Sequence, residues 1–173
     1  MTRDYPDEPA GEFPGPPRAV SDREDREVEL LSADASDHES VLEMYLSFDP
    51  ADRAQGIPPA REEAIEDWLD TILGEDTLNV VAVHEGSVVG HATLVPDRHG
   101  EYELAIFVLQ AFQGAGIGTH LVETLLGLAQ SRSVEHVWLT VERWNDPAVA
   151  LYRKVGFETT EAESFEIEMS IRL

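Results

Sequence analysis

Apolar and polar positions along the chain follow two periods, one typical of strands and one typical of helices. Apolar runs of strand length gather after residue 77, and two of them are joined at Glu85-Gly86, which is a hairpin signal. Strands are therefore predicted at residues 27–33, 77–84, 87–95, 102–109, 136–141, 157–160 and 165–172.

Apolar residues at helical spacing predict helices between these strands. Ser36 and Glu39 offer a capping box for the first helix, and Pro59 suits the first turn of the second. The fold class indicated is α/β (α+β), with a single mixed, mostly antiparallel sheet of six to seven strands flanked by about four helices. The predicted helices cover about 36–48, 59–73, 117–132 and a short segment opened by Asn145, Asp146 and Pro147.

The first 26 residues differ from the rest of the chain. They hold five of the ten prolines and many charges, with few apolar residues to bury. This composition predicts a disordered, acidic, proline-rich tail over residues 1–26, followed by one domain over residues 27–173. No signal-peptide core is visible, and no stretch approaches the roughly 18 apolar residues of a membrane span, so we expect a cytoplasmic protein without a membrane partner.

Acidic residues dominate the composition, with 35 Asp and Glu against 12 Lys and Arg and a formal charge of −23. Nucleic acid is not expected as a partner, because its phosphates would be repelled. The acidity could attract a cationic substrate, or it could keep the protein hydrated in a salt-accumulating cytoplasm. Because Lys154 is the only lysine and the acids spread over the whole chain, we favour the second, halophilic interpretation.

The residue types present also exclude several kinds of site. The sequence has no cysteine, which excludes disulfide frameworks, thiolate metal ligands and cysteine nucleophiles. The six histidines lack the spacing of a helical metal site, so no metal is expected. The serine-hydrolase pattern G-x-S-x-G is absent as well.

The segment QAFQGAGIG (110–118) places three alternating glycines between a predicted strand and a predicted helix. Backbone N–H groups at such a turn can bind phosphate, aided by the helix dipole. A P-loop would need a lysine that is missing here, and a G-x-G-x-x-G fingerprint would need glycine where Thr119 or Leu121 stands. A glycine turn without any ligand is the remaining alternative from these residues alone.

Two motifs resemble the GCN5-related N-acetyltransferase (GNAT) superfamily. The segment 113–118, QGAGIG, matches its Q/R-x-x-G-x-G/A signature, and LTVERWNDPAVALYRKVGFE (139–158) resembles its second hallmark. The resemblance implies a GNAT acetyltransferase domain over residues 27–173 that uses acetyl-coenzyme A as cosubstrate. The cofactor-binding positions it implies are Phe107, Val108, Leu109, Gln113, Gly114, Ala115, Gly116, Ile117, Gly118, Thr119, Asn145 and Tyr152.

Catalytic residues follow from the same resemblance. Tyr152 matches the tyrosine that protonates the leaving thiolate in many members, although its place on an apolar helix face is also typical of a core residue. Glu103 is the preferred base, because an acid beside apolar strand neighbours can have a raised pKa. A solvated carboxylate is the alternative for Glu103, and His91, Glu142 or water are alternative bases.

The predicted activity is transfer of acetyl to a primary amine by direct attack in a ternary complex. The acceptor, a small molecule or a protein lysine or N-terminus, would enter between the segments 48–60 and 158–165. A non-catalytic acetyl-coenzyme A sensor is the alternative from another class. The resemblance to the family also implies a possible homodimer.

Overall fold

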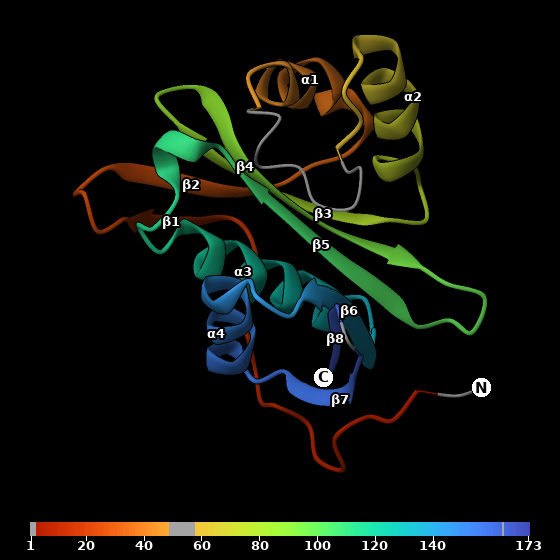
Figure 1. The fold of residues 1–173 in the computed structure, drawn as a ribbon. Helices are drawn as coiled ribbons and strands as arrows, with labels where there is room; N and C mark the ends of the chain where they lie inside the picture. Colours follow the sequence, from red (N-terminus) through yellow and green to blue (C-terminus); the bar gives the residue numbers. More distant parts are fainter. Residues whose placement is uncertain (1–2, 49–57, 164) are drawn as a thin grey trace.

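An eight-stranded sheet forms the centre of the computed structural model, which describes residues 3–48, 58–163 and 165–173 (Figure 1). Its order is β1-β2-β3-β4-β5-β6-β8-β7, and the pair β5–β6 is parallel while the others are antiparallel. The strands are β1 (Arg18–Ser21), β2 (Glu27–Ser32), β3 (Leu78–His84), β4 (Ser87–Pro96), β5 (Tyr102–Val108), β6 (His136–Glu142), β7 (Glu158–Ala162) and β8 (Glu166–Arg172).

The sheet has one strand more than the upper end of the six to seven predicted. The additional strand is β1, which lies in the segment predicted to be a disordered tail and pairs with β2 from Arg18↔Leu30 to Ser21↔Glu27. A strand of four residues carries little periodicity of its own, so its pairing with β2 could not be deduced from local sequence. The predicted class of fold, one mixed sheet with helices, is confirmed.

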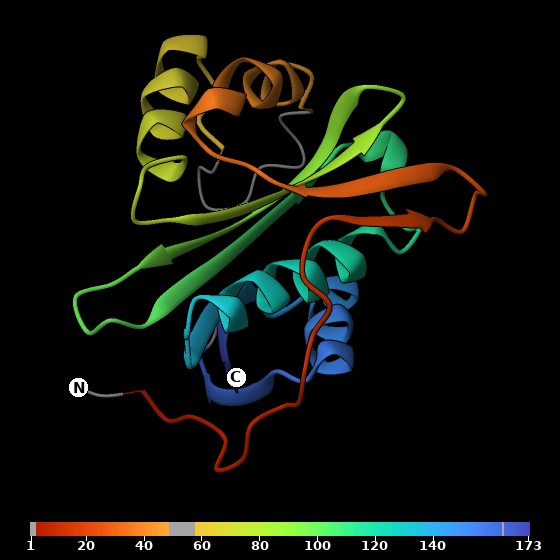
Figure 2. The same cartoon turned by 180° about the vertical axis from the view of Figure 1, so that it is seen from behind.

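Helices cover both faces of the sheet (Figures 1 and 2). On one face α1 (His38–Leu46) and α2 (Glu62–Ile72) enclose a smaller core, and on the other α3 (Ile117–Ser131) and α4 (Asp146–Val155) enclose a larger one. Each buries the apolar stripe that predicted it. Among the described residues, none of these helices is long and apolar enough to cross a membrane.

The first helix begins differently from the prediction. Asp34, rather than Ser36, forms the capping box: its carboxylate accepts from the Ser36 backbone N–H at 2.9 Å, and the Asp37 carboxylate accepts from the Asp34 N–H at 3.0 Å. This box caps a short 3-10 turn over Ala35–Asp37 that leads into α1. The second helix begins at Glu62 rather than at Pro59.

The segment before β1 follows the surface of the domain, which differs from the disordered tail expected from composition (Figure 2). The Ala10 N–H donates to the Arg172 carbonyl at 2.9 Å, and the Phe13 N–H donates to Oε1 of Gln130 at 2.9 Å. Near Gly127 of α3 the chain passes so close that a Cβ there would lie 2.5 Å from the carbonyl carbon of Pro14. Because its prolines disfavour helix and strand, this segment is held by contacts with residues far away in the sequence.

The strands β5 and β6 are paired at one end and separate toward the other. Their ladder consists of Tyr102↔Val137 and Glu103↔Trp138, whereas β5 pairs with β4 along its whole length. Beyond Glu103, β5 therefore has no strand partner on its β6 side among the described residues. This opening in the sheet positions the site described next.

Candidate functional site

The glycine segment joins β5 to α3 through a turn that needs glycine at two positions. Gly114 and Gly116 have φ angles of 73° and 91°, in the left-handed region that L side chains rarely adopt. Gly116 is also the N-cap of α3, and it provides no side-chain cap. The first N–H groups of α3 thus remain available for an anion, and the first turn of the helix contains no acidic residue to compete with it.

A cavity of about 790 Å³ connects this turn to the opening between β5 and β6 and to α4. Both sequence motifs that resemble the GNAT superfamily contribute to its lining. The predicted cofactor-binding residues that line it are Val108, Gln113, Gly114, Gly116, Gly118, Thr119, Asn145 and Tyr152.

The other four predicted cofactor-binding residues do not line the cavity. Ala115 and Ile117 are buried in the protein, and Phe107 packs in the core under α1 and α2, on the opposite face of the sheet. Leu109 uses its N–H for the Val89 carbonyl at 2.9 Å. Any role of Phe107 in the cavity would therefore have to come from its main chain.

Tyr152 combines a buried ring with a hydroxyl that no other described residue contacts through a hydrogen bond. The residue is 7% exposed, and its ring packs edge-on against Phe157, with 5.8 Å between ring centroids. Among the described residues its hydroxyl has no hydrogen-bond partner. The residue lines the cavity. Burial raises the pKa of Tyr152 above its usual value of 10, so the phenol keeps its proton at neutral pH.

Asn145 has a structural role in addition to its place in the cavity. It is the N-cap of α4, and its Oδ1 accepts from the Ala148 backbone N–H at 3.3 Å. Pro147 in the first turn of α4 reinforces the helix start. The asparagine of the second motif therefore orients the helix that carries Tyr152.

The two carboxylates considered as bases lie at different ends of the opening. Glu103 is exposed and occupies the last paired position of β5, opposite Trp138, whereas Glu142 lies at the far end of β6 and lines the cavity with Tyr152. Partial desolvation raises the pKa of Glu103, the Arg3 guanidinium lowers it, and the Asp97 carboxylate raises it.

His91 belongs to a buried hydrogen-bond chain. Its Nδ1 lies 2.7 Å from the Tyr45 hydroxyl and its Nε2 lies 2.7 Å from Oδ1 of Asn79. The Asn79 amide nitrogen donates to the Ile72 carbonyl, so Oδ1 must accept from Nε2–H and Nδ1 must accept from Tyr45. Because burial lowers the pKa of His91 to about 3, both nitrogens are committed to a neutral, structural network.

We expect Tyr45→Phe to destabilise the fold without a direct effect on the cavity. The change leaves Nδ1 of His91 buried without a donor, which costs about 1–3 kcal/mol of unfolding free energy. Denaturant unfolding measures this loss. Tyr102→Phe is the control, because the Tyr102 hydroxyl has no hydrogen-bond partner among the described residues, and an equal loss in both variants would contradict the assignment.

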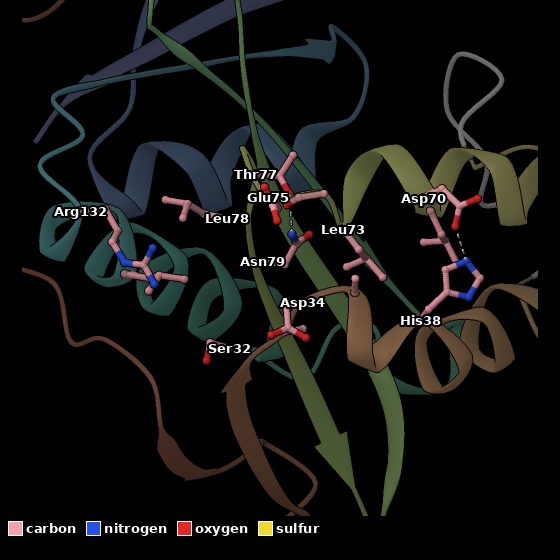
Figure 3. A pocket seen from close by; sticks show the side chains of 15 residues that line it. Ser32, Asp34, His38, Asp70, Leu73, Glu75, Thr77, Leu78, Asn79 and Arg132 are labelled. Carbon is pink, nitrogen blue, oxygen red and sulfur yellow. Dashed lines mark hydrogen bonds and ion pairs between the residues drawn. The ribbon is translucent and has the colours of Figure 1, made fainter.

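A second cavity of about 700 Å³ lies between the start of α1, the end of α2 and the end of α3 (Figure 3). Its wall includes a contact of 3.2 Å between Nε2 of His38 and Oδ1 of Asp70, and it includes Asn79 of the His91 network. None of the residues predicted for cofactor binding or catalysis lines it. No cluster of side chains suited to a metal ion occurs in the described part of the chain.

Sequence reasoning missed several residues of the first cavity. Arg23 comes from the segment predicted to be disordered, and Lys154 lies on α4 beyond Tyr152. Helical spacing from Tyr152 could have indicated the residues of α4, but no local signal could have indicated Arg23. The predicted acceptor segments lie partly outside the described residues, since these exclude 49–57 and 164.

Comparisons with known proteins identify the family of the chain. The chain matches the model of the "Acetyltransferase (GNAT) family" over residues 38–157, and it belongs to that family. It is 36% identical over 141 residues to a mycothiol acetyltransferase of Saccharomonospora viridis, covering 73% of this chain and 44% of the relative. It is 43% identical over 79 residues to the N-alpha-acetyltransferase RimI of Mycobacterium tuberculosis, covering 42% of this chain and 47% of the relative.

A solved structure shares the fold. The putative acetyltransferase yncA of Salmonella typhimurium, in a structure with its cofactor acetyl-CoA, has a TM-score of 0.69 and 19% identity, covering 84% of this chain and 94% of that one. The chain thus spans less than half the length of the two curated relatives above, so their whole activities do not transfer directly.

Proposed function

We propose that this protein is an N-acetyltransferase that transfers acetyl from acetyl-coenzyme A to a primary amine. The observation that carries the proposal is one cavity lined both by the start of α3, which has no side-chain cap, and by Tyr152, whose hydroxyl has no hydrogen-bond partner among the described residues. The donor set fits the cofactor, because backbone N–H groups suit a pyrophosphate and a phenol suits a thiol leaving group. Family membership supports the same activity.

When bound, acetyl-coenzyme A supplies an activated thioester. The glycine turn and the first turn of α3 would bind its pyrophosphate, and main-chain groups of β5 facing the opening would orient its arm toward the paired end of β5 and β6. Glu103, at that end, would take a proton from the acceptor amine through water. The amine nitrogen would then attack the thioester carbon, and Tyr152 would give its proton to the sulfur as the carbon–sulfur bond breaks. The second proton lost by the nitrogen would return to the phenolate through water, which restores Tyr152.

Direct attack needs both substrates at once, so we propose a ternary complex without an acetyl-enzyme. The names of the relatives point to a mycothiol acetyltransferase and an N-alpha-acetyltransferase, and the acceptor class proposed here is correspondingly broad: a primary amine on a small molecule or on a protein. We also propose that the protein works in the salt-rich cytoplasm of a halophile, and its formal charge of −23 supports this. Assays should therefore be made in molar potassium chloride.

Calorimetry with acetyl-coenzyme A, alongside release of free thiol over a panel of amines and lysine peptides, tests this proposal. Binding together with turnover on at least one amine is the expected result. Binding without turnover over the whole panel would overturn the enzyme in favour of a sensor. No binding at all would overturn both.

A further inference from the structure

Arg23 lies in a turn whose shape is fixed by a buried carboxylate. Asp22 is 5% exposed, and its Oδ1 accepts from the N–H groups of Glu24 and Arg26, each at 2.9 Å. Its Oδ2 accepts from Nε of Arg26 at 2.7 Å. These hydrogen bonds hold the connection between β1 and β2 in one conformation, and Arg23 directly follows the Asp22 that accepts them.

The turn is attached directly to the glycine segment. The Arg23 N–H donates to the Ala115 carbonyl at 2.9 Å, and Nη1 of Arg26 donates to the Ala111 carbonyl at 3.1 Å. The Arg26 guanidinium also lies over the ring of Phe112, 4.2 Å from its centroid. Three contacts therefore fix the position of the Arg23 backbone relative to the proposed pyrophosphate site.

The side chain of Arg23 extends over that site. It lines the same cavity as Gly114, Gly116 and Thr119, and a Cβ on Gly116 would lie 3.7 Å from Nε of Arg23. Arg3 and Arg26 pair with carboxylates, whereas within the described residues the Arg23 side chain forms no ion pair or hydrogen bond. The Arg23 guanidinium is therefore not held by another protein group in the described residues, and it lies where it can contact a ligand in the cavity.

The charge around the start of α3 agrees with an anion there. Desolvation first, and then the positive charges of Arg18, Lys154 and Arg23, lower the pKa of His120, while Glu123 raises it. The first residue of the glycine motif contributes no charge, because it is Gln113, and its amide nitrogen donates to the Val108 carbonyl at 2.9 Å. Any positive charge beside the phosphates therefore comes from outside the motif, and among the described residues Arg23 and Lys154 are the cations that line the cavity.

We propose that Arg23 binds the pyrophosphate of coenzyme A, so that the β1–β2 turn forms one wall of the cofactor site. This inference rests on the proposed function, and it adds a residue that lies before residue 38, where the family match begins. The guanidinium forms charge-assisted hydrogen bonds with phosphate oxygens, which the N–H groups of α3 contact from the other side.

Calorimetry on the full chain at fixed ionic strength tests the proposal with two probes, coenzyme A and dephospho-coenzyme A, which lacks the 3′-phosphate but keeps the pyrophosphate. Arg23→Gln is expected to weaken both about tenfold, as expected for the loss of a charged hydrogen bond. Arg23→Lys should restore part of the affinity. Arg98→Gln makes the same charge change on the exposed β4–β5 turn and should bind like the unaltered protein.

The outcomes separate this inference from the function on which it rests. Loss of affinity for coenzyme A but not for dephospho-coenzyme A would overturn the pyrophosphate assignment in favour of the 3′-phosphate. Unchanged affinity of Arg23→Gln for both probes, or an equal loss in Arg98→Gln, would overturn any role of Arg23. If the unaltered protein binds neither probe, the proposed function itself fails.

Discussion

Tyr152→Phe is expected to lower kcat about a hundredfold, within the range typical of a lost general acid. In this structure the substitution removes the hydroxyl and disturbs few other contacts. The hydroxyl has no hydrogen-bond partner among the described residues, so its removal leaves no unsatisfied protein group, and the phenylalanine ring keeps the contact with Phe157. Cofactor affinity should change little, because the proton is needed only when the carbon–sulfur bond breaks.

Steady-state kinetics and calorimetry on the same preparation check this expectation. The control Tyr102→Phe removes a hydroxyl at the start of β5, outside the cavity, and should keep full activity. Because burial raises the pKa of Tyr152, the phenol stays protonated at and above neutral pH, and its ionisation should not limit the rate there. An unchanged kcat in Tyr152→Phe would identify the residue as a core tyrosine only.

The sequence predicted the elements whose signals are local. The hairpin at Glu85-Gly86 is present, with both residues at positive φ, as a tight turn between paired strands requires. The start of α3 after the glycines was also predicted within a residue, because the glycine turn and the helical period meet there. Both signals arise from neighbours in the chain.

What the sequence could not predict depends on residues far apart. Tyr45, His91 and Asn79 form one buried chain of hydrogen bonds, but their spacings of 46 and 12 residues carry no pattern. Composition alone predicted a disordered tail, whereas its contacts involve Arg172, Gln130 and Ala115, which only the folded domain brings near. A rule based on local composition cannot include such partners.

The same limit explains why Arg23 was not recognised. The glycine motif begins with the neutral Gln113, so the local sequence indicates only backbone N–H groups and the helix dipole for a phosphate. The fold instead brings a cation from a separate turn, anchored by Asp22 through Arg26. In a chain with few basic residues, position in the fold decides what each of them can bind.

Glu103→Gln is expected to lower kcat/KM about a hundredfold near neutral pH, because a general base contributes at least this much in typical enzymes. Only the ionised carboxylate can accept a proton, so the rate should fall as the pH decreases through the pKa of Glu103. Partial desolvation raises this pKa, which places the acidic limb above the usual value for glutamate of 4.5. In the variant this limb should disappear.

A pH–rate profile for kcat/KM measures the change, and the substrate provides an internal reference. Deprotonation of the acceptor amine produces its own rise with pH, which belongs to the substrate and should persist in Glu103→Gln. The comparison variant is Glu142→Gln, because Glu142 lines the cavity with Tyr152 at the open end of the strands. If the acidic limb survives in Glu103→Gln but is lost in Glu142→Gln, the base is Glu142, and the amine is deprotonated at the open rather than the paired end of β5 and β6.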